Sequence, residues 1–304
     1  MGVLFVFVDG VGAGAADPAV NPLARVEHLL SRFEDGTGAP LPHGGRARLA
    51  DACLGVPGRP QSATGQSTIL TGENAPRHLG RHLLGFPNAP LRALLGERSL
   101  FRRLAAAGLR GAFLNAYPVA YLRALGLEAE GEPEFAFGRR MPRASATTVA
   151  YAAGGGRFRT WADARAGRAL THDVTGRRAA AFRASIPERT PEEAAAILAA
   201  VTAEHDLTVF EFFETDEAGH ARDPDHALDA LDRVDRLLRA VLERLGPDDA
   251  LVVTSDHGNV EDLSIRNHTR APVPVLGFGR AAGEVGGVTD LTDVAPLLLR
   301  LAGA

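Results

Sequence analysis

The chain has 304 residues, 45% of them hydrophobic and 23% charged, which fits one large α/β domain with an insertion or two unequal domains. A formal net charge of −4 excludes the strongly basic surface that is typical of nucleic-acid binding. All 33 basic residues are arginine, so a lysine Schiff base is excluded and a substrate's negative charge must be met by arginines or metals.

The single cysteine, Cys53, excludes a disulfide framework and is typical of a reducing compartment. The apolar run at residues 3–8 follows no basic segment and ends at Asp9, which makes it too short for a signal peptide or a membrane span. We therefore expect a soluble, cytoplasmic protein without a membrane partner.

Apolar runs predict the strands of a buried sheet. The first, at residues 3–8, is apolar at every position, which is typical of a strand covered on both faces in a parallel sheet. Comparable runs follow at 112–114, 207–213, 250–254 and 273–278.

Helical patterns alternate with these runs. This alternation favours an α/β fold with an open, mostly parallel sheet and helices on both of its faces. Thr190 and Glu193 predict a capping box that begins one of the helices. The expected helices lie at 62–70, 91–107, 191–203, 224–245 and 293–301.

Residues 116–189 lack clean periodicity and are rich in arginine, glycine and alanine. We expect this stretch to be an inserted lid or cap within one α/β core domain. The two pieces of that core would comprise residues 1–115 and 190–304, with borders accurate to about ten residues.

Side chains that can bind metals follow several of the apolar runs. They are Asp9, Asp216, His220, Asp256, His257 and His268. Because ligands collect at the carboxyl ends of the strands in open α/β sheets, we expect these side chains to meet there. Carboxylates and imidazoles without a usable thiolate suit Mn²⁺ or Zn²⁺, with Mg²⁺ as an alternative.

Ser62 is the candidate nucleophile. It lies at the start of the expected helix 62–70, where free backbone N–H groups and the helix dipole favour an alkoxide and a phosphoryl group. A serine hydroxyl is a poor nucleophile at neutral pH, but coordination to a dication lowers its pKa. Two such metals about 3.5–4 Å apart can hold the attacking and leaving oxygens of an in-line displacement.

These motifs resemble those of two related families. Residues 254–261 read Thr-Ser-Asp-His-Gly-Asn-Val-Glu, similar to the T-A-D-H-G-N-x-E of cofactor-independent phosphoglycerate mutases. Residues 268–274 resemble their H-T-x-x-x-V-P in the H-T-R form of phosphopentomutases, and residues 216–220 resemble D-x-x-G-H. Residues 62–65 fall where those families read S-E-V-G-H or T-T-T-G-H. The chain is thus similar to these branches of the alkaline-phosphatase superfamily over roughly 1–115 and 190–304.

The resemblance implies a two-metal phosphoryl-transfer enzyme that acts through a phosphoserine at Ser62. By position, it implies that one divalent metal is held by Asp216, His220 and His268. It implies that the other is held by Asp9, Asp256, His257 and the Ser62 oxygen.

Two departures from the family pattern bear on the reaction. Gln66 stands where the mutases carry a histidine, and the insertion 116–189 is smaller than their cap domain. A short lid protects a phosphoserine from water less well, which favours a phosphohydrolase acting on a small phosphate ester. A phosphomutase of the phosphoglycerate mutase or phosphopentomutase type is the alternative, and a non-catalytic metal-binding member is the second. The sequence identifies neither the substrate nor the oligomeric state.

Four arginines near these motifs are candidates for binding the substrate. Arg77 and Arg81 follow the Ser62 helix, and Arg270 lies two residues after His268. Arg140 belongs to a basic run in the insertion that could clamp a phosphate or simply face solvent. An ordinary solvated turn is the alternative for the stretch around Arg77 and Arg81.

The glycine-rich stretch 10–14, directly after the first expected strand, resembles a dinucleotide-binding loop. It lacks the third glycine of that motif at the required spacing. Asp9 is therefore better explained as a metal ligand.

Overall fold

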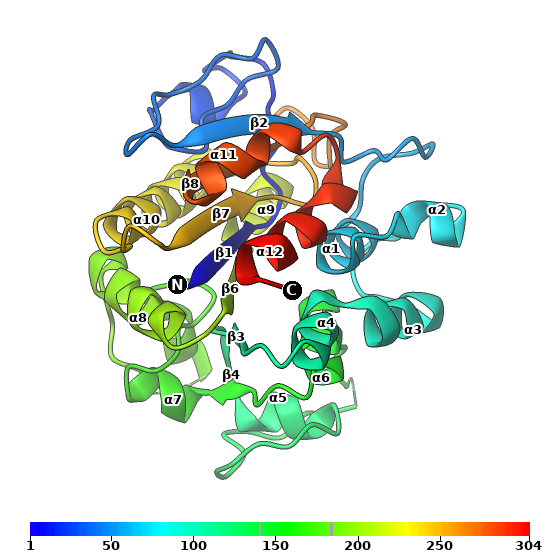
Figure 1. Ribbon diagram of the computed structural model, residues 1–304, viewed down its shortest axis with the longest axis vertical. Helices are drawn as coiled ribbons and strands as arrows, with labels where there is room; N and C mark the ends of the chain where they lie inside the picture. The colour runs from blue at the N-terminus through cyan, green and yellow to red at the C-terminus, as the bar shows by residue number, and fades with distance from the viewer. Residues whose placement is uncertain (140, 183–184) are drawn as a thin grey trace.

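The computed structural model describes residues 1–139, 141–182 and 185–304. Within them the chain forms a six-stranded sheet in the order β2–β8–β7–β1–β6–β3 (Figure 1). Neighbouring strands from β3 through β6 and β1 to β7 run parallel, whereas β8 is antiparallel to both β7 and β2. The strands are β1 (Val3–Val8), β2 (Arg46–Ala50), β3 (Gly111–Phe113), β6 (Leu207–Phe212), β7 (Ala250–Thr254) and β8 (Val273–Gly279).

The expected mostly parallel α/β sheet is confirmed, with one strand that the sequence did not predict. Edge strand β2 has the sequence Arg-Ala-Arg-Leu-Ala and is largely exposed or half-buried, so it contains no apolar run. Its two arginines suit an edge position, because charged side chains there oppose pairing with another chain.

Strand β1 lies at the centre of the sheet, between β6 and β7. All of its residues are buried, the odd-numbered ones in one hydrophobic core and the even-numbered ones in the other. Val8 is level with Phe212, and Phe7 is level with Thr254, so the three strands end at the same edge. The residues that follow them therefore meet there.

Helices cover both faces of the sheet (Figure 1). One core contains side chains of α8, α9 and α10, and the other contains side chains of α1, α3, α4, α6 and α12. Outside the segment 116–189 the helices are α1 (Ser62–Thr71), α2 (Ala75–Leu79), α3 (Ala89–Arg98), α4 (Leu100–Ala106), α8 (Pro191–Ala203), α9 (Glu214–Ala221), α10 (Pro224–Leu242), α11 (Ala281–Glu284) and α12 (Val294–Ala302). Short 3-10 turns lie at η1 (Pro22–Ala24), η3 (Val285–Gly287) and η4 (Leu291–Asp293).

The single helix expected at 91–107 is wrong, because the structure has two helices there. Ser99 is extended, with φ −61° and ψ 149°, and it ends α3 and begins α4. Its hydroxyl accepts a hydrogen bond from the Arg102 N–H and donates to the Ala150 carbonyl. A serine that caps the start of a second helix ends the first helix. The apolar residues keep their helical spacing across such a break, so the sequence pattern does not reveal it. The capping box of Thr190 and Glu193 at the start of α8 is present as expected.

The segment 116–189 contains the short parallel pair β4 (Ala116–Tyr117) and β5 (Arg159–Thr160), helices α5 (Val119–Ala124), α6 (Ala146–Ala153) and α7 (Trp161–Arg165), and the 3-10 helix η2 (Arg177–Phe182). Helix α6 packs against α1, α3 and α4, so this part of the segment is joined to the main core. The division into an inserted lid at 116–189 and a core at 1–115 and 190–304 stays a prediction. No helix in the described ranges is long and apolar enough to cross a membrane.

Candidate metal centre

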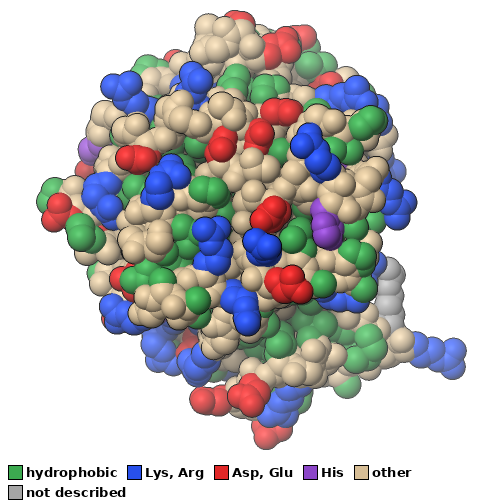
Figure 2. All heavy atoms as spheres, turned by 45° about the vertical axis from the view of Figure 1, so that its right-hand side comes forward, with side chains coloured by type: hydrophobic (Ala, Val, Ile, Leu, Met, Phe, Trp, Pro, Cys, Tyr) green, Lys and Arg blue, Asp and Glu red, His purple; other side chains and the backbone are tan. Residues whose placement is uncertain are grey.

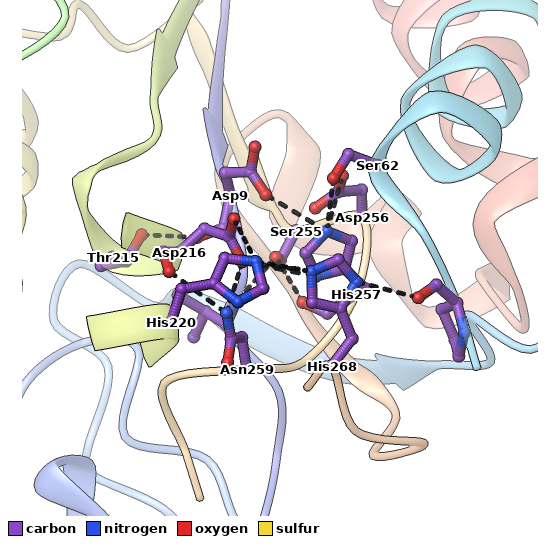
Figure 3. A network of polar contacts seen from close by, with 12 residues as sticks. Asp9, Ser62, Thr215, Asp216, His220, Ser255, Asp256, His257, Asn259 and His268 are labelled. Carbon is purple, nitrogen blue, oxygen red and sulfur yellow. Dashed lines mark hydrogen bonds and ion pairs between the residues drawn. The ribbon is translucent and has the colours of Figure 1, made fainter. Parts of the chain in front are cut away.

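The seven predicted ligands converge at the carboxyl edge of the sheet (Figure 3). Asp9 follows β1, Asp216 and His220 lie on α9, Asp256 and His257 follow β7, His268 precedes β8, and Ser62 begins α1. Segments as distant in sequence as β1 and the loop before β8 thus supply one cluster. The structure divides that cluster into the two groups that the sequence resemblance implied.

The first group consists of Asp216, His220 and His268. The two residues on α9 are four apart, so both point from the same face of the helix. Nε2 of His220 lies 3.3 Å from Asp216 Oδ2, and Nε2 of His268 lies 3.6 Å from Asp216 Oδ1. The Nε2 atoms of the two histidines are 3.1 Å apart, so they converge on one point.

The second group consists of Asp9, Asp256 and His257, with Ser62 beside it. Nε2 of His257 lies 3.4 Å from both Asp9 Oδ1 and Asp256 Oδ2. Ser62 Oγ lies 3.0 Å from the same nitrogen. All four side chains therefore present a donor atom to one small volume at the start of α1.

Buried polar atoms in the second group fit a cation. Among the described residues, Asp9 Oδ1, both carboxylate oxygens of Asp256 and His257 Nδ1 are buried and make no hydrogen bond. Buried polar atoms without partners are costly, whereas a dication would be coordinated by such oxygens. The side chains present thus suit a divalent metal in both number and type.

The pKa values of these buried groups also fit a metal site. Burial raises the pKa of Asp9 well above its ordinary value, and the charges of Asp256 and Asp216 raise it further. Burial and the charge of Asp216 likewise raise the pKa of Asp256. Burial, with the charge of His268, lowers the pKa of His257 to about 3, which keeps that imidazole in the neutral form that binds metals.

Asp216 differs from the other two aspartates. Burial acts to raise its pKa, but the hydrogen bonds with His220 and Asn259 help to outweigh burial and hold the pKa well below its usual range. Its Oδ1 also accepts a 2.6 Å hydrogen bond from Asn259 Nδ2. Asp216 is therefore the carboxylate of the centre that stays ionised most readily.

Hydrogen bonds outside the ligand set orient several ligands. His220 Nδ1 lies 2.9 Å from the carbonyl oxygen of Arg266, which leaves its Nε2 free to face Asp216. The Thr215 hydroxyl donates to the carbonyl oxygen of Asp9 and so ties the start of α9 to the end of β1. Gln66 Nε2 donates to Asp9 Oδ2 at 3.2 Å, so the residue that departs from the family pattern holds a predicted ligand.

Sequence reasoning missed the roles of Asn259 and Thr215, although Asn259 belongs to the motif 254–261. It also missed Glu211, a charged residue inside the apolar run 207–213. The Glu211 side chain is buried, and burial raises its pKa to about 7, although a hydrogen bond with Thr147 acts in the opposite direction. A lone carboxylate within a run of buried residues was the signal that could have found it.

The predicted substrate arginines have different surroundings. Arg270 Nε donates a 3.0 Å hydrogen bond to the carbonyl oxygen of Gly58, in the loop that leads to Ser62. Arg77 lies on α2 and Arg81 just after it, and both are exposed. Arg140 lies outside the described residues. Of the four, Arg270 has the only described hydrogen bond to the nucleophile loop.

This fold and this paired cluster define a metal-dependent α/β enzyme class, and comparison with known proteins agrees. A family model described as the metalloenzyme superfamily matches residues 149–304, slightly more than half of the chain. The chain belongs to this superfamily, and the resemblance found in its motifs is confirmed.

Curated relatives match over a limited stretch. A phosphopentomutase from Chromohalobacter salexigens is 48% identical over 73 residues, which is 24% of this chain and 17% of that protein. A 2,3-bisphosphoglycerate-independent phosphoglycerate mutase from Halobacterium salinarum is 36% identical over 107 residues, which is 32% of this chain and 21% of that protein. The matched stretches thus span about a fifth of the relatives' length.

Solved structures match over nearly the whole chain. The PH0037 protein from Pyrococcus horikoshii has a TM-score of 0.57 and 16% identity, with 99% of this chain and 96% of that chain covered. The alkaline phosphatase from the Antarctic bacterium TAB5 has a TM-score of 0.56 and 11% identity, with coverage of 99% and 97%. At these identities the similarity establishes the fold.

Proposed function

We propose that this chain is a phosphohydrolase that cleaves a small phosphate ester through a phosphoserine at Ser62. The observation that carries the proposal is the position of Ser62 Oγ, 3.0 Å from His257 Nε2 at the first turn of α1. There the hydroxyl is adjacent to one candidate metal group and within the same cluster as the other (Figure 3).

The first turn of α1 can receive a phosphoryl group. Its N-cap residue, Gln61, makes no side-chain capping hydrogen bond. Within the described part of the chain, the N–H groups of Ser62 and Ala63 also make no hydrogen bond. Free N–H groups at the positive end of a helix bind phosphate oxygens, so α1 can orient the ester above the serine.

The reaction consists of two successive displacements at phosphorus. Ser62 Oγ forms a bond to phosphorus while the bond to the leaving alcohol breaks, and the alcohol leaves with a proton. Water then forms a bond to the same phosphorus, the Ser62 Oγ–phosphorus bond breaks, and Ser62 Oγ regains a proton from the water as inorganic phosphate is released. Dications held by the two groups would neutralise the clustered carboxylates and lower the pKa of the Ser62 hydroxyl.

Access of water to the metal centre favours hydrolysis over mutase chemistry. The side chain of His220 is 40% exposed and that of Asp216 is 16% exposed, so one candidate metal group is open to water. A phosphomutase is the second candidate, because the curated relatives described above carry mutase names. The single, half-buried Cys53 supports the further proposal of a cytoplasmic location. The carboxylate and imidazole ligands support the further proposal of Mn²⁺ or Zn²⁺, or else Mg²⁺, as the bound metal.

A substrate screen tests the proposal. Phosphate monoesters and diesters are incubated with the protein and Mn²⁺, Zn²⁺ or Mg²⁺, and released phosphate and isomerised product are measured together. Phosphate release supports the hydrolase. Isomerised sugar or glycerate phosphate without release identifies a mutase, and no turnover with any metal contradicts both.

A further inference from the structure

Glu261 is a buried carboxylate at the metal centre that is not one of the predicted ligands. It is 1% exposed, and its described hydrogen-bond partners are all neutral donors. Its Oε2 accepts hydrogen bonds from the N–H groups of Gly12 at 2.9 Å and Asn259 at 2.7 Å. Its Oε1 accepts a hydrogen bond from the Thr269 hydroxyl. Three donors thus replace the cation that a buried carboxylate usually has.

Each donor belongs to a loop that carries a predicted metal ligand. Gly12 lies three residues after Asp9, Asn259 lies two residues after His257, and Thr269 directly follows His268. Asn259 extends the connection, because its side chain donates to Asp216 Oδ1. One carboxylate therefore joins the segments around three ligands directly, two of them within the connection between β7 and β8, and reaches Asp216 on α9 through one amide.

Gly12, in the glycine-rich stretch 10–14, is explained by this carboxylate. A Cβ atom at Gly12 would lie 2.5 Å from Glu261 Oε1, and a Cβ at Gly258 would lie 2.1 Å from the same atom. Neither position has room for a side chain while Glu261 is in place. Gly12 thus lets the backbone after β1 approach the carboxylate of Glu261, whereas Gly10 has a φ of +72° and lies against Asp216. Neither role involves a dinucleotide.

We infer that Glu261 is a positioning residue that holds the loops of Asp9, His257 and His268 in the geometry that binds metal. The inference rests on the proposed two-metal function, because it assigns Glu261 an effect on that centre. It acts through hydrogen bonds and shape. A neutral glutamine can therefore replace it, with its carbonyl oxygen accepting from Gly12 and Asn259 and its amide donating to Thr269.

The experiment measures Co²⁺ and Zn²⁺ binding by each site, using competition with a chelator and the visible spectrum of bound Co²⁺. Glu261→Ala is expected to weaken both sites by about 10–100-fold, the usual effect of losing a group that orients ligands. Glu261→Gln is expected to bind both metals close to wild-type affinity, with an unchanged Co²⁺ spectrum.

Thr269→Val tests one arm alone. It removes the hydroxyl that donates to Glu261 and that accepts from the Ala271 N–H in the same loop, so it should weaken only the Asp216, His220 and His268 site. The matched control is Thr289→Val, which removes a threonine-to-carboxylate hydrogen bond with Asp293 at an exposed position. This control should leave both affinities unchanged. Thermal unfolding of each metal-free variant shows which ones fold.

The outcomes separate this inference from the proposed function. A wild-type protein that binds no metal overturns both. A wild-type protein that binds two metals, with equal affinities in Glu261→Ala, overturns the inference alone. If Glu261→Ala fails to fold, the other two variants decide: a Thr269→Val effect on both sites equally, or a Glu261→Gln protein that folds but loses metal, overturns it.

Discussion

His268 Nδ1 lies 3.0 Å from the carbonyl oxygen of Pro60, two residues before Ser62. Because a carbonyl accepts, Nδ1 carries the proton and Nε2 is left with a lone pair directed at Asp216 and His220. The same imidazole therefore faces one candidate metal group and fixes the loop that leads to the candidate nucleophile. Arg270, two residues further on, holds Gly58 of that loop in the same way.

Ser62→Ala is expected to lose nearly all turnover, on the order of 10³-fold or more in kcat, because the attacking oxygen is removed. It should keep both metals, since the six other ligands remain. Turnover of an aryl phosphate and elemental analysis of the same sample check the two statements. The control is Ser67→Ala on the same helix. Among the described residues its hydroxyl donates only to the Ala63 carbonyl, so its loss should leave the rate nearly unchanged.

Substantial phosphate release by Ser62→Ala would contradict the phosphoserine route and make water the nucleophile. In the wild-type protein, mass spectrometry after acid quench should detect phosphate on Ser62 during turnover of a hydrolase. Phosphate that persists on Ser62 in the resting protein would instead indicate a mutase.

His268→Ala is expected to lose one of two bound metals. The change removes one of three ligands from the group with Asp216 and His220, while the group at Asp9 keeps all of its own. Elemental analysis after Mn²⁺ or Zn²⁺ loading should fall from two metals per chain to one. His43→Ala, an exposed histidine paired with Glu243, should retain two. Loss of both metals in His268→Ala would show that the groups do not bind independently.

Metal removal is expected to lower the melting temperature. Three carboxylates, those of Asp9, Asp216 and Asp256, lie close together and repel one another without a cation. A metal present at 100 times its dissociation constant stabilises the folded protein by about 2.7 kcal/mol per site. Calorimetry with a chelator and again after metal is restored measures the change. An unchanged melting curve in protein known to have carried metal would contradict the assignment.

Glu211→Gln is expected to stabilise the metal-free protein at pH 8 but not at pH 4. The pKa of Glu211 is raised from 4.5 to about 7 by burial, so the folded state binds its proton more tightly than the unfolded state does. The stability due to the protonated carboxyl is present below pH 4.5 and is lost as the pH rises through 7. A shift of this size corresponds to about 3 kcal/mol at pH 8.

Urea denaturation of both proteins at the two pH values measures that difference. Glu97→Gln, an exposed carboxylate on α3, serves as the control and should change stability little at either pH. Equal stability of Glu211→Gln and the wild-type protein at pH 8 would mean that Glu211 is ionised without penalty.

The sequence was most informative where a side chain that can bind metal directly follows a predicted strand. Asp9 could be predicted as a ligand because an apolar run ends at it, and the ends of parallel strands meet at one edge. Ser99 could not be predicted as a break, because a buried cap leaves the helical period intact. The hydrogen bonds made by Asn259 and Glu261 join residues brought together only by the folded sheet, so their partners could not be predicted from spacing.

The central position of β1 also has a consequence for how the chain folds. The ribosome makes this strand before its two neighbours, β6 and β7, which lie about 200 and 250 residues further along the chain. An entirely apolar strand therefore stays unpaired until these distant segments have been made, and long-range pairing of this kind is slow. In chains that stop before β7, the edge of β1 that normally pairs with β7 would be exposed. Such chains would be expected to aggregate even if the helices before β7 are formed.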